Sequence, residues 1–350
     1  MNVKTLALAA AAAAVATSSQ AADLPVAAEP VDYVQACDAF GAGFFKLPGK
    51  DTCIKLGGRI RAQVVSGNIS DDEGDEYEAY SKGYLYFTSM TNSEIGTIKT
   101  YTELTAKWSD DTTDEEIEAG DVYVQLGMDY GSFLFGRESS AFDGFTGYTW
   151  IGPVGNAYSD QSTLQASFTA DLGNGVTATI SAEDATYRGG EDSGADVVGA
   201  LKISQGWGSF KVAAAAHDQA SHEGYGYAAG ATLAINLDML SEGAEFTFQA
   251  QYADEAGKYI AADAEETGYA LSGGIEVPLS EKLTAALDVS YQDLDNKADE
   301  STAAINGSLA YSPVSGLTFA VAAGYADVES DIAKDDKETS QIGARVQYTF

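Results

Sequence analysis

Short runs in which apolar and polar residues alternate recur from residue 53 to the last residue of this 350-residue chain. In the first run, residues 54 to 64, aliphatic and small side chains take the even positions, whereas Lys55, Arg59 and Arg61 take odd positions. This alternation is typical of strands with one apolar face and one wet face. We count about sixteen such runs, and none contains the roughly 18 successive apolar residues of a membrane helix. The sequence therefore predicts an all-β protein.

The connections between these runs alternate in length. Short turns, such as the Gly-Asn-Gly hairpin within residues 171 to 175, alternate with long polar links such as residues 66 to 80 and 138 to 161. Most of the 53 Asp and Glu residues lie in the long links, and the net charge is −34. Short turns at one end and long polar loops at the other are typical of outer-membrane barrels. We therefore predict a 16-stranded antiparallel transmembrane β-barrel over residues 53 to 350.

A soluble exported β-sandwich or repeat adhesin would also show alternation. The runs are rich in Ala, Gly and Thr rather than in the large aliphatics of a sandwich core, and Tyr252, Tyr291 and Tyr325 lie near strand ends. Both features favour a membrane barrel with interfacial aromatic girdles.

Clustered Lys and Arg for binding nucleic acid are missing, and so are the common hydrolase and nucleotide-binding motifs. We expect no enzyme, no cofactor, no metal site and no nucleic-acid partner.

The N-terminus has the pattern of an export signal. Lys4 precedes an apolar run over residues 6 to 16, and Ser19 and Ala21 supply the small residues of a cleavage site. We predict that residues 1 to 21 are removed and that residues 22 to 52 form a segment in the periplasm or the lumen. After export, Cys37 and Cys53 are expected to be bonded to each other rather than free or metal-bound.

Several segments together resemble the alphaproteobacterial porin family, within the general trimeric porins of the outer membrane. They are residues 33 to 53, Gly96-Thr-Ile-Lys-Thr-Tyr-Thr-Glu, Phe135-Gly-Arg-Glu-Ser, Gln205-Gly-Trp-Gly, Ile235-Asn-Leu-Asp-Met-Leu and Tyr311-Ser-Pro-Val. The resemblance implies a homotrimer that carries small hydrophilic solutes and ions by passive diffusion, with a third long loop folded into its lumen. It also implies contact with outer-membrane lipids, including lipopolysaccharide, and a terminal aromatic, here Phe350, that resembles the signal read by the barrel-assembly machinery.

Sixteen strands enclose more space than their own side chains fill, so the interior is expected to hold water. The link over residues 139 to 160 is the long one that is rich in Gly, aromatics and Pro, and we expect it to narrow the lumen. The family typically places a basic arc of the wall across from acids of the third loop. The expected constriction residues are Arg59, Arg61, Lys99 and Arg137 on the wall and Asp143 and Asp160 on the loop. Lys55, Lys107 and Arg345 share the inward parity.

Arg137 has a conflicting parity. It falls on the same side of its run as Phe133 and Phe135, so it faces lipid unless the strand ends or bulges there.

Two other functions stay open. An outer-membrane enzyme would use His217, Asp218, Ser221 and His222, which fall in one predicted loop, and a substrate-specific sugar or oligopeptide channel would need an aromatic ladder, which we do not trace in the sequence.

The acids of the long loops predict that cations accumulate at the mouth and give weak cation selectivity at low salt. The other interpretation is that these loops only form a solvated surface, bridged by divalent ions to lipopolysaccharide phosphates.

Overall fold

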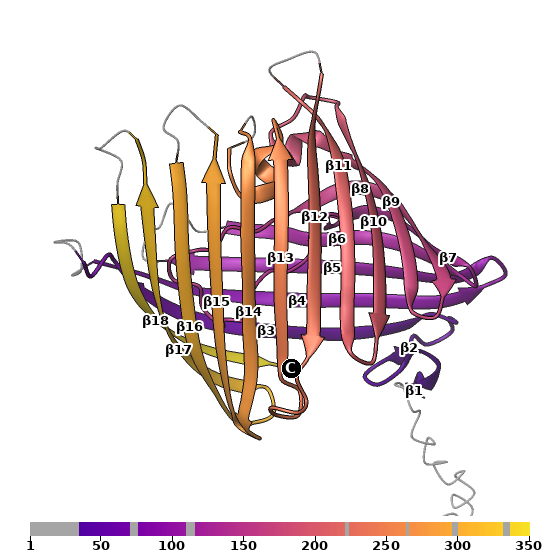
Figure 1. Ribbon diagram of the computed structural model, residues 1–350. Coiled ribbons are helices and arrows are strands. Elements are labelled where there is room, and N and C mark those ends of the chain that lie inside the picture. Colours follow the sequence, from indigo (N-terminus) through magenta and orange to yellow (C-terminus); the bar gives the residue numbers. More distant parts are fainter. Residues whose placement is uncertain are drawn as a thin grey trace, which may run out of the picture.

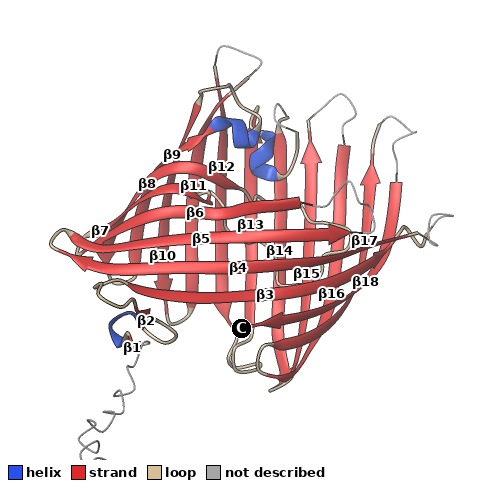
Figure 2. Cartoon of the chain, turned by 180° about the vertical axis from the view of Figure 1, so that it is seen from behind, coloured by secondary structure: helices blue, strands red, loops and turns tan. Residues whose placement is uncertain are grey.

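The computed structural model describes residues 35–70, 76–109, 116–220, 224–263, 266–295, 300–331 and 337–350. Within these ranges the chain forms one antiparallel sheet that closes into a barrel (Figures 1 and 2). The barrel strands are β3 (Cys53–Ser66), β4 (Tyr77–Ser93), β5 (Gly96–Ser109), β6 (Glu116–Met128), β7 (Gly131–Ser139), β8 (Ser162–Gly173), β9 (Val176–Asp184), β10 (Ala195–Gln205), β11 (Gly208–Asp218), β12 (Tyr225–Asn236), β13 (Glu245–Asp254), β14 (Gly268–Ser280), β15 (Leu283–Leu294), β16 (Glu300–Val314), β17 (Leu317–Glu329) and β18 (Lys337–Thr349).

Each barrel strand pairs with its neighbours in the sequence, and β18 pairs with β3 to close the sheet. Closure satisfies the backbone hydrogen bonds that an open edge would leave exposed in hydrocarbon. The predicted 16-stranded barrel is confirmed, as is the alternation of short turns with longer loops. In Figure 1 the chain ends at the lower rim of the barrel.

The last residue takes part in the closure. The Phe350 amide donates to the Gly58 carbonyl, and the Gly58 amide donates to the Phe350 carbonyl, both at 3.0 Å. A Cβ at Gly58 would lie 2.8 Å from the Phe350 ring and 2.6 Å from the Tyr84 carbonyl oxygen. Glycine is therefore required where the terminal ring crosses β3.

The two faces of the wall differ as the alternation predicts. On β3, Leu56, Ile60 and Val64 point outward and are 54%, 52% and 40% exposed, while the charged and polar residues between them point inward. Large apolar side chains are exposed in the same way on strands all round the barrel. Such a surface would be costly in water, so the fold requires a hydrocarbon exterior.

The N-terminal segment packs beside the start of β3. Strands β1 (Gln35–Ala36) and β2 (Phe45–Lys46) pair with each other around the short helix η1 (Asp38–Phe40), and β2 also pairs with β3. Cys37 and Cys53 form a disulfide with their Cα atoms 6.1 Å apart, as predicted. This segment lies below the barrel in Figure 1. The predicted signal peptide falls outside the described residues, and none of the described helices is long and apolar enough to cross a membrane.

Two short helices fold over the upper rim of the barrel (Figure 2). They are η4 (Ala185–Arg188), after β9, and η5 (Gly257–Ile260), after β13. Tyr259 and Ile260 are fully buried in an apolar cluster that includes Phe142, Val198 and several alanines of β11 to β14. Part of the barrel interior is therefore packed like a protein core rather than left to water.

Candidate functional site

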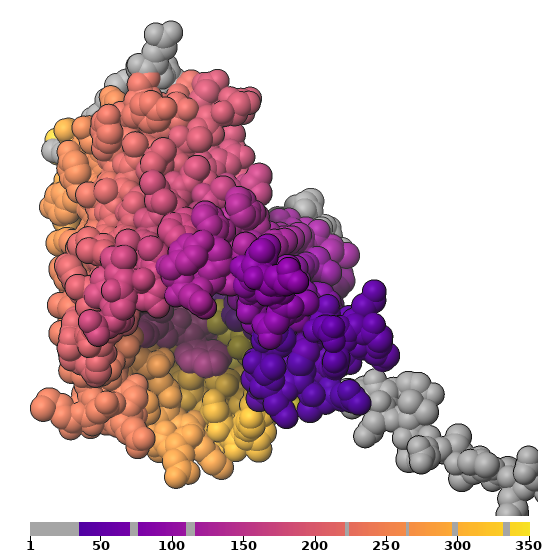
Figure 3. Space-filling view, turned by 90° about the vertical axis from the view of Figure 1, so that its right-hand side faces the viewer, coloured from indigo at the N-terminus to yellow at the C-terminus, as the bar shows by residue number. Residues whose placement is uncertain are grey.

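The inward positions of the wall are mainly polar. Tyr123, Glu138, Gln165 and Gln249 are examples from four strands, and their neighbours in sequence point outward. A hollow opens into the interior between the indigo N-terminal residues and the orange and yellow C-terminal strands (Figure 3). A polar lumen inside an apolar exterior is the arrangement of an aqueous channel.

The third long loop, residues 140–161, enters this lumen, and we call it the inner loop. Its residues bond to inward side chains of strands far away in the sequence. The Phe145 amide donates to Gln249 of β13 at 2.7 Å, and the Trp150 amide donates to Ser308 of β16 at 3.1 Å. The inner loop therefore lies along the wall made by the C-terminal half of the barrel, and among the described residues none of its hydrogen bonds reaches β3 to β6.

Asp288 of β15 is the strongest anchor of this loop. Its carboxylate accepts bonds from the amides of Tyr148 and Thr149 and from the Thr149 hydroxyl, at 2.6 to 3.0 Å. The side chain is 1% exposed, so these donors replace water around a buried charge. Because backbone amides supply two of the donors, Asp288 fixes the path of the loop itself.

Inward glycines on the wall make room for apolar side chains of the loop. A Cβ at Gly274 of β14 would lie 2.8 Å from the Phe145 ring, and one at Gly324 of β17 would lie 2.9 Å from Val154. Gly343 of β18 accommodates Ile151 in a similar way. The glycines therefore let the inner loop lie close against the wall and keep its bulk out of the channel.

Asp143 lies at the base of the inner loop, where we expected an acid that faces the basic wall across the constriction, but its side chain is buried. Its side chain is 6% exposed and its Oδ1 lies 2.9 Å from Arg188 Nη2. The carboxylate also accepts bonds from the Ser159 hydroxyl and the Gln161 amide. The guanidinium of η4 neutralises this acid within the packed part of the lumen.

Asp160, the other acid expected on the loop, is exposed at the loop's return to β8. Partial burial and the nearby Asp143 raise the pKa of Asp160, and the opposing effect of Arg188 is smaller.

His217 is buried rather than exposed in an external loop. It is the second-last residue of β11, is 2% exposed, and its Nδ1 lies 2.9 Å from the Asp196 carboxylate. The Tyr259 hydroxyl donates to the same carboxylate at 2.7 Å. The network joins η5 to the wall and encloses the imidazole, whereas Ser221 and His222 fall outside the described residues. Within the described ranges, no group of three metal-ligating side chains occurs.

The structure places Arg59, Arg61 and Lys99 on inward positions of β3 and β5, as expected. Lys82 of β4 lies opposite both Arg61 and Lys107 in the register, and the sequence analysis missed it. We call Arg59, Arg61, Lys82 and Lys99 the basic arc. Among the described residues, no carboxylate lies within 4 Å of any of their charged nitrogens. The arc therefore keeps its positive charge on the open side of the lumen.

The conflicting parity of Arg137 is resolved toward the exterior, which corrects its expected place in the constriction. Arg137 pairs with the outward Val122 and Leu164, which are 40% and 51% exposed. Its guanidinium donates to the Gly120 carbonyl at 2.7 Å and lies 5.9 Å from the centre of the Tyr187 ring. A register shift in the pairing of β5 with β6 occurs beside Gly120, and carbonyls there satisfy the outward cation.

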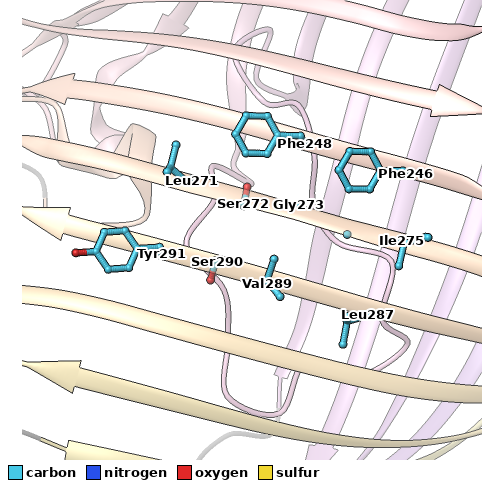
Figure 4. Close-up of a pocket in the computed structure, with 11 residues that line it drawn as sticks. Phe246, Phe248, Leu271, Ser272, Gly273, Ile275, Leu287, Val289, Ser290 and Tyr291 are labelled. Atoms are coloured by element: carbon cyan, nitrogen blue, oxygen red, sulfur yellow. The ribbon is translucent and has the colours of Figure 1, made fainter.

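The outer face carries a separate apolar groove over Gly273 of β14 (Figure 4). Phe246, Phe248, Leu271, Ile275, Leu287 and Val289 border it. These are outward residues of β13 to β15, so the groove belongs to the lipid-facing surface and not to the channel.

Comparisons with known proteins agree with this geometry. A family model described as "Porin subfamily" matches residues 23–348. Porin Omp2a of Brucella suis is 32% identical over 355 residues, which cover 91% of each chain, and porin Omp2b of Brucella neotomae is 30% identical over 99% of each. The crystal structure of the outer membrane channel DcaP of Acinetobacter baumannii is 14% identical, has a TM-score of 0.70 and covers 85% of this chain and 97% of its own. An anion-selective porin from Comamonas acidovorans has a TM-score of 0.58 at 12% identity, over 85% of this chain and 100% of its own.

Proposed function

The chain belongs to the porin subfamily and forms an outer-membrane channel, not an enzyme, and we propose that solutes pass between its inner loop and the basic arc. Small hydrophilic solutes and ions diffuse down their own gradients, and no energy source is needed. The observation that carries this proposal is the position of the inner loop, which is bonded to β13, β15 and β16 while the basic arc lies on β3 to β5.

We propose that charge, as well as width, sieves the solutes. Arg59, Arg61 and Lys99 line one side of the path, and Asp160 lies on the loop side. Charges of opposite sign on two sides of a narrow passage orient dipolar solutes and change local ion concentrations without tight binding. The acids of the external loops act earlier, at the mouth, where they accumulate cations at low salt.

We propose that the channel is a homotrimer that associates through the outer face of β3 to β5. This face carries Ser81, Gly83 and Thr102, and the outward hydroxyls of Ser89 and Thr100 lie 2.6 Å apart. This face also carries large apolar residues such as Leu56, Leu85 and Leu104, as β13 to β15 carry Phe248 and Leu271, so the small and hydroxyl-bearing residues on β4 and β5 are what distinguish it. Small and hydroxyl-bearing residues suit close protein contact better than contact with lipid tails.

Three further proposals concern export and assembly. Residues 1–21 are a cleaved signal peptide, which N-terminal sequencing of the exported protein would establish. Phe350, at 64% exposure on the rim, is available for recognition by the barrel-assembly machinery before it pairs with Gly58. The acidic external loops contact lipopolysaccharide, with divalent ions between carboxylates and phosphates, and chelation would loosen this contact.

Ion conductance of the purified, folded protein in a planar bilayer tests the channel proposal. We expect stepwise current increases that scale with salt concentration, and exclusion of neutral polymers above a defined size. At low salt, a reversal potential that favours cations supports the role of the external acids, and the preference should fade as the Debye length falls to about 3 Å near 1 M salt. A reversal potential favouring anions at low salt would contradict the role of these acids. A membrane that stays electrically silent would contradict the channel itself.

A further inference from the structure

Four tyrosines form a continuous row on the inner wall beside the basic arc. Tyr84 and Tyr86 alternate on β4, and Tyr101 and Tyr123 lie opposite each other on β5 and β6. Neighbouring ring centroids are 6.3, 6.4 and 5.5 Å apart along the row. The last two pairs have interplanar angles of only 18° and 27°. We call these four residues the tyrosine row.

Cations stand at both ends of the tyrosine row. The Arg59 guanidinium lies 4.0 Å from the centre of the Tyr84 ring, with Lys82 at 5.3 Å from the same ring. At the other end, Lys99 lies 5.2 Å from the Tyr123 ring and donates to its hydroxyl at 2.9 Å. Arg59 Nε is buried and has no hydrogen-bond partner among the described residues. The row therefore carries positive charge at both of its ends.

A carboxylate completes the set of groups. Glu103 of β5 lies directly opposite Tyr86 in the register and points to the same inner face. A carboxylate accepts hydrogen bonds from hydroxyl groups. The cations cannot accept such bonds, and the faces of the rings accept them poorly. Aromatic faces, cations and one acceptor thus occur together on a single stretch of wall.

The inner loop leaves this stretch uncovered. Within the described ranges, its hydrogen bonds to the barrel wall are made with β9, β11, β13, β15 and β16, and none of its ring contacts involves the tyrosine row. Tyr84, Tyr86 and Tyr101 are partly exposed, and Tyr123 is 9% exposed. The row therefore faces the same open part of the lumen as the basic arc.

We propose that the tyrosine row is a binding site for acidic sugars that pass through the channel. This proposal rests on the channel function proposed above. The apolar face of the sugar ring packs on Tyr86 and Tyr101, the sugar carboxylate binds Arg59 or Lys99, and ring hydroxyls donate to Glu103. A pair of aromatic rings contributes about 0.5–1.5 kcal/mol beyond the area it buries, and we take the same magnitude for a sugar face on a ring, so binding is weak and release is fast. Such a site speeds the passage of a dilute solute without trapping it.

Solute block of the ion current tests this site with three solutes of similar size. Glucuronate has a ring and a charge, glucose has the ring without the charge, and gluconate has the charge on an open chain. We expect glucuronate to reach half-block of the wild-type channel at a concentration about two- to tenfold below that of gluconate, the factor that 0.5–1.5 kcal/mol corresponds to. Glucose, which lacks the carboxylate, should also need a higher concentration than glucuronate. Equal half-blocking concentrations for glucuronate and gluconate would overturn the proposal.

Variants assign the preference to the row. In Tyr86→Leu/Tyr101→Leu, glucuronate should block no better than gluconate, because apolar bulk remains while the flat rings are lost. Tyr86→Phe/Tyr101→Phe should keep the preference. Tyr80→Leu is the matched control, since Tyr80 also points inward from β4 but lies outside the row. A preference that survives the double leucine variant would overturn the site. Loss of all ion current in the wild type would instead refute the channel function.

Discussion

Arg188 and Asp143 form a buried ion pair that holds the base of the inner loop to helix η4, with Nη2 and Oδ1 2.9 Å apart and side-chain exposures of 1% and 6%. Arg188 also donates to the Ser159 hydroxyl and to the Lys258 carbonyl, both at 3.0 Å. One guanidinium therefore joins the inner loop, η4 and η5. The pair lies within the packed part of the lumen.

Removing one partner should destabilise the barrel. Arg188→Met leaves the Asp143 carboxylate buried without its cation, which costs about 3–5 kcal/mol when a buried pair is broken. We expect a lower unfolding midpoint in urea and more noise in the open-channel current. Arg188→Met/Asp143→Asn removes the uncompensated charge and should recover much of the loss. If Arg188→Met has the unfolding midpoint and the open-channel current noise of the wild type, the pair does not hold the loop.

Filling the recess at Gly274 should displace the inner loop. In Gly274→Ala the new Cβ would lie 2.3 Å from Asp288 Oδ1 and 2.8 Å from the Phe145 ring. Overpacking of this kind costs about 1–3 kcal/mol, and the loop can move only toward the open lumen. We expect a lower unfolding midpoint and a smaller single-channel conductance. Gly199→Ala is the control, because nothing lies within 4 Å of its added Cβ, and it should match the wild type.

Neutralising the basic arc should shift ion selectivity toward cations. One charge at about 4 Å contributes about 1 kcal/mol in water, so Arg59→Gln, Arg61→Gln or Lys99→Gln lowers the local anion concentration up to about fivefold. The reversal potential in a salt gradient measures this change. Arg137→Gln removes the same charge from the outer face and should leave the reversal potential unchanged. A shift of equal size in Arg137→Gln would place that arginine in the lumen.

As the pH falls, the ion selectivity should shift toward anions at a higher pH than it would if only carboxylates with ordinary pKa values titrated. The pKa of Asp160 is raised by burial and by Asp143, so this acid loses its charge at a higher pH than a typical Asp as the pH falls. We expect the reversal potential to move toward anions as the pH falls, starting above the pH range in which an ordinary Asp titrates. The Asp160→Asn variant should already be shifted at pH 7 and change less on acidification. Identical pH profiles for the two proteins would exclude Asp160 as the group that titrates.

The barrel could be predicted from sequence because one periodicity decides it. The alternation in residues 54 to 64 assigns Ile60 to lipid and Arg61 to the lumen, and the register agrees. The same parity argues against an inward Arg137, and there the family expectation was wrong while the alternation was right. Local pattern suffices where a side chain has only two directions to point.

The interior could not be predicted because it depends on contacts between distant segments. No local sequence pattern indicates that Arg188 pairs with Asp143. Nor does any local pattern indicate that Asp288 accepts hydrogen bonds from two backbone amides that lie 139 and 140 residues away in the sequence. The tyrosine row was missed although its parity was readable, because Tyr86, Tyr101 and Tyr123 become neighbours only through the strand register. Inward glycines such as Gly274 and Gly324 were a usable signal for the path of the loop.

Thiol modification inside the channel tests the central claim most directly. Because Cys37 and Cys53 are bonded to each other, Arg61→Cys introduces one reactive thiol at the lumen wall. A bulky anionic thiol reagent should reduce the single-channel current of Arg61→Cys promptly and leave Arg137→Cys unaffected. A current through Arg61→Cys that the reagent does not change would contradict a path along the basic arc.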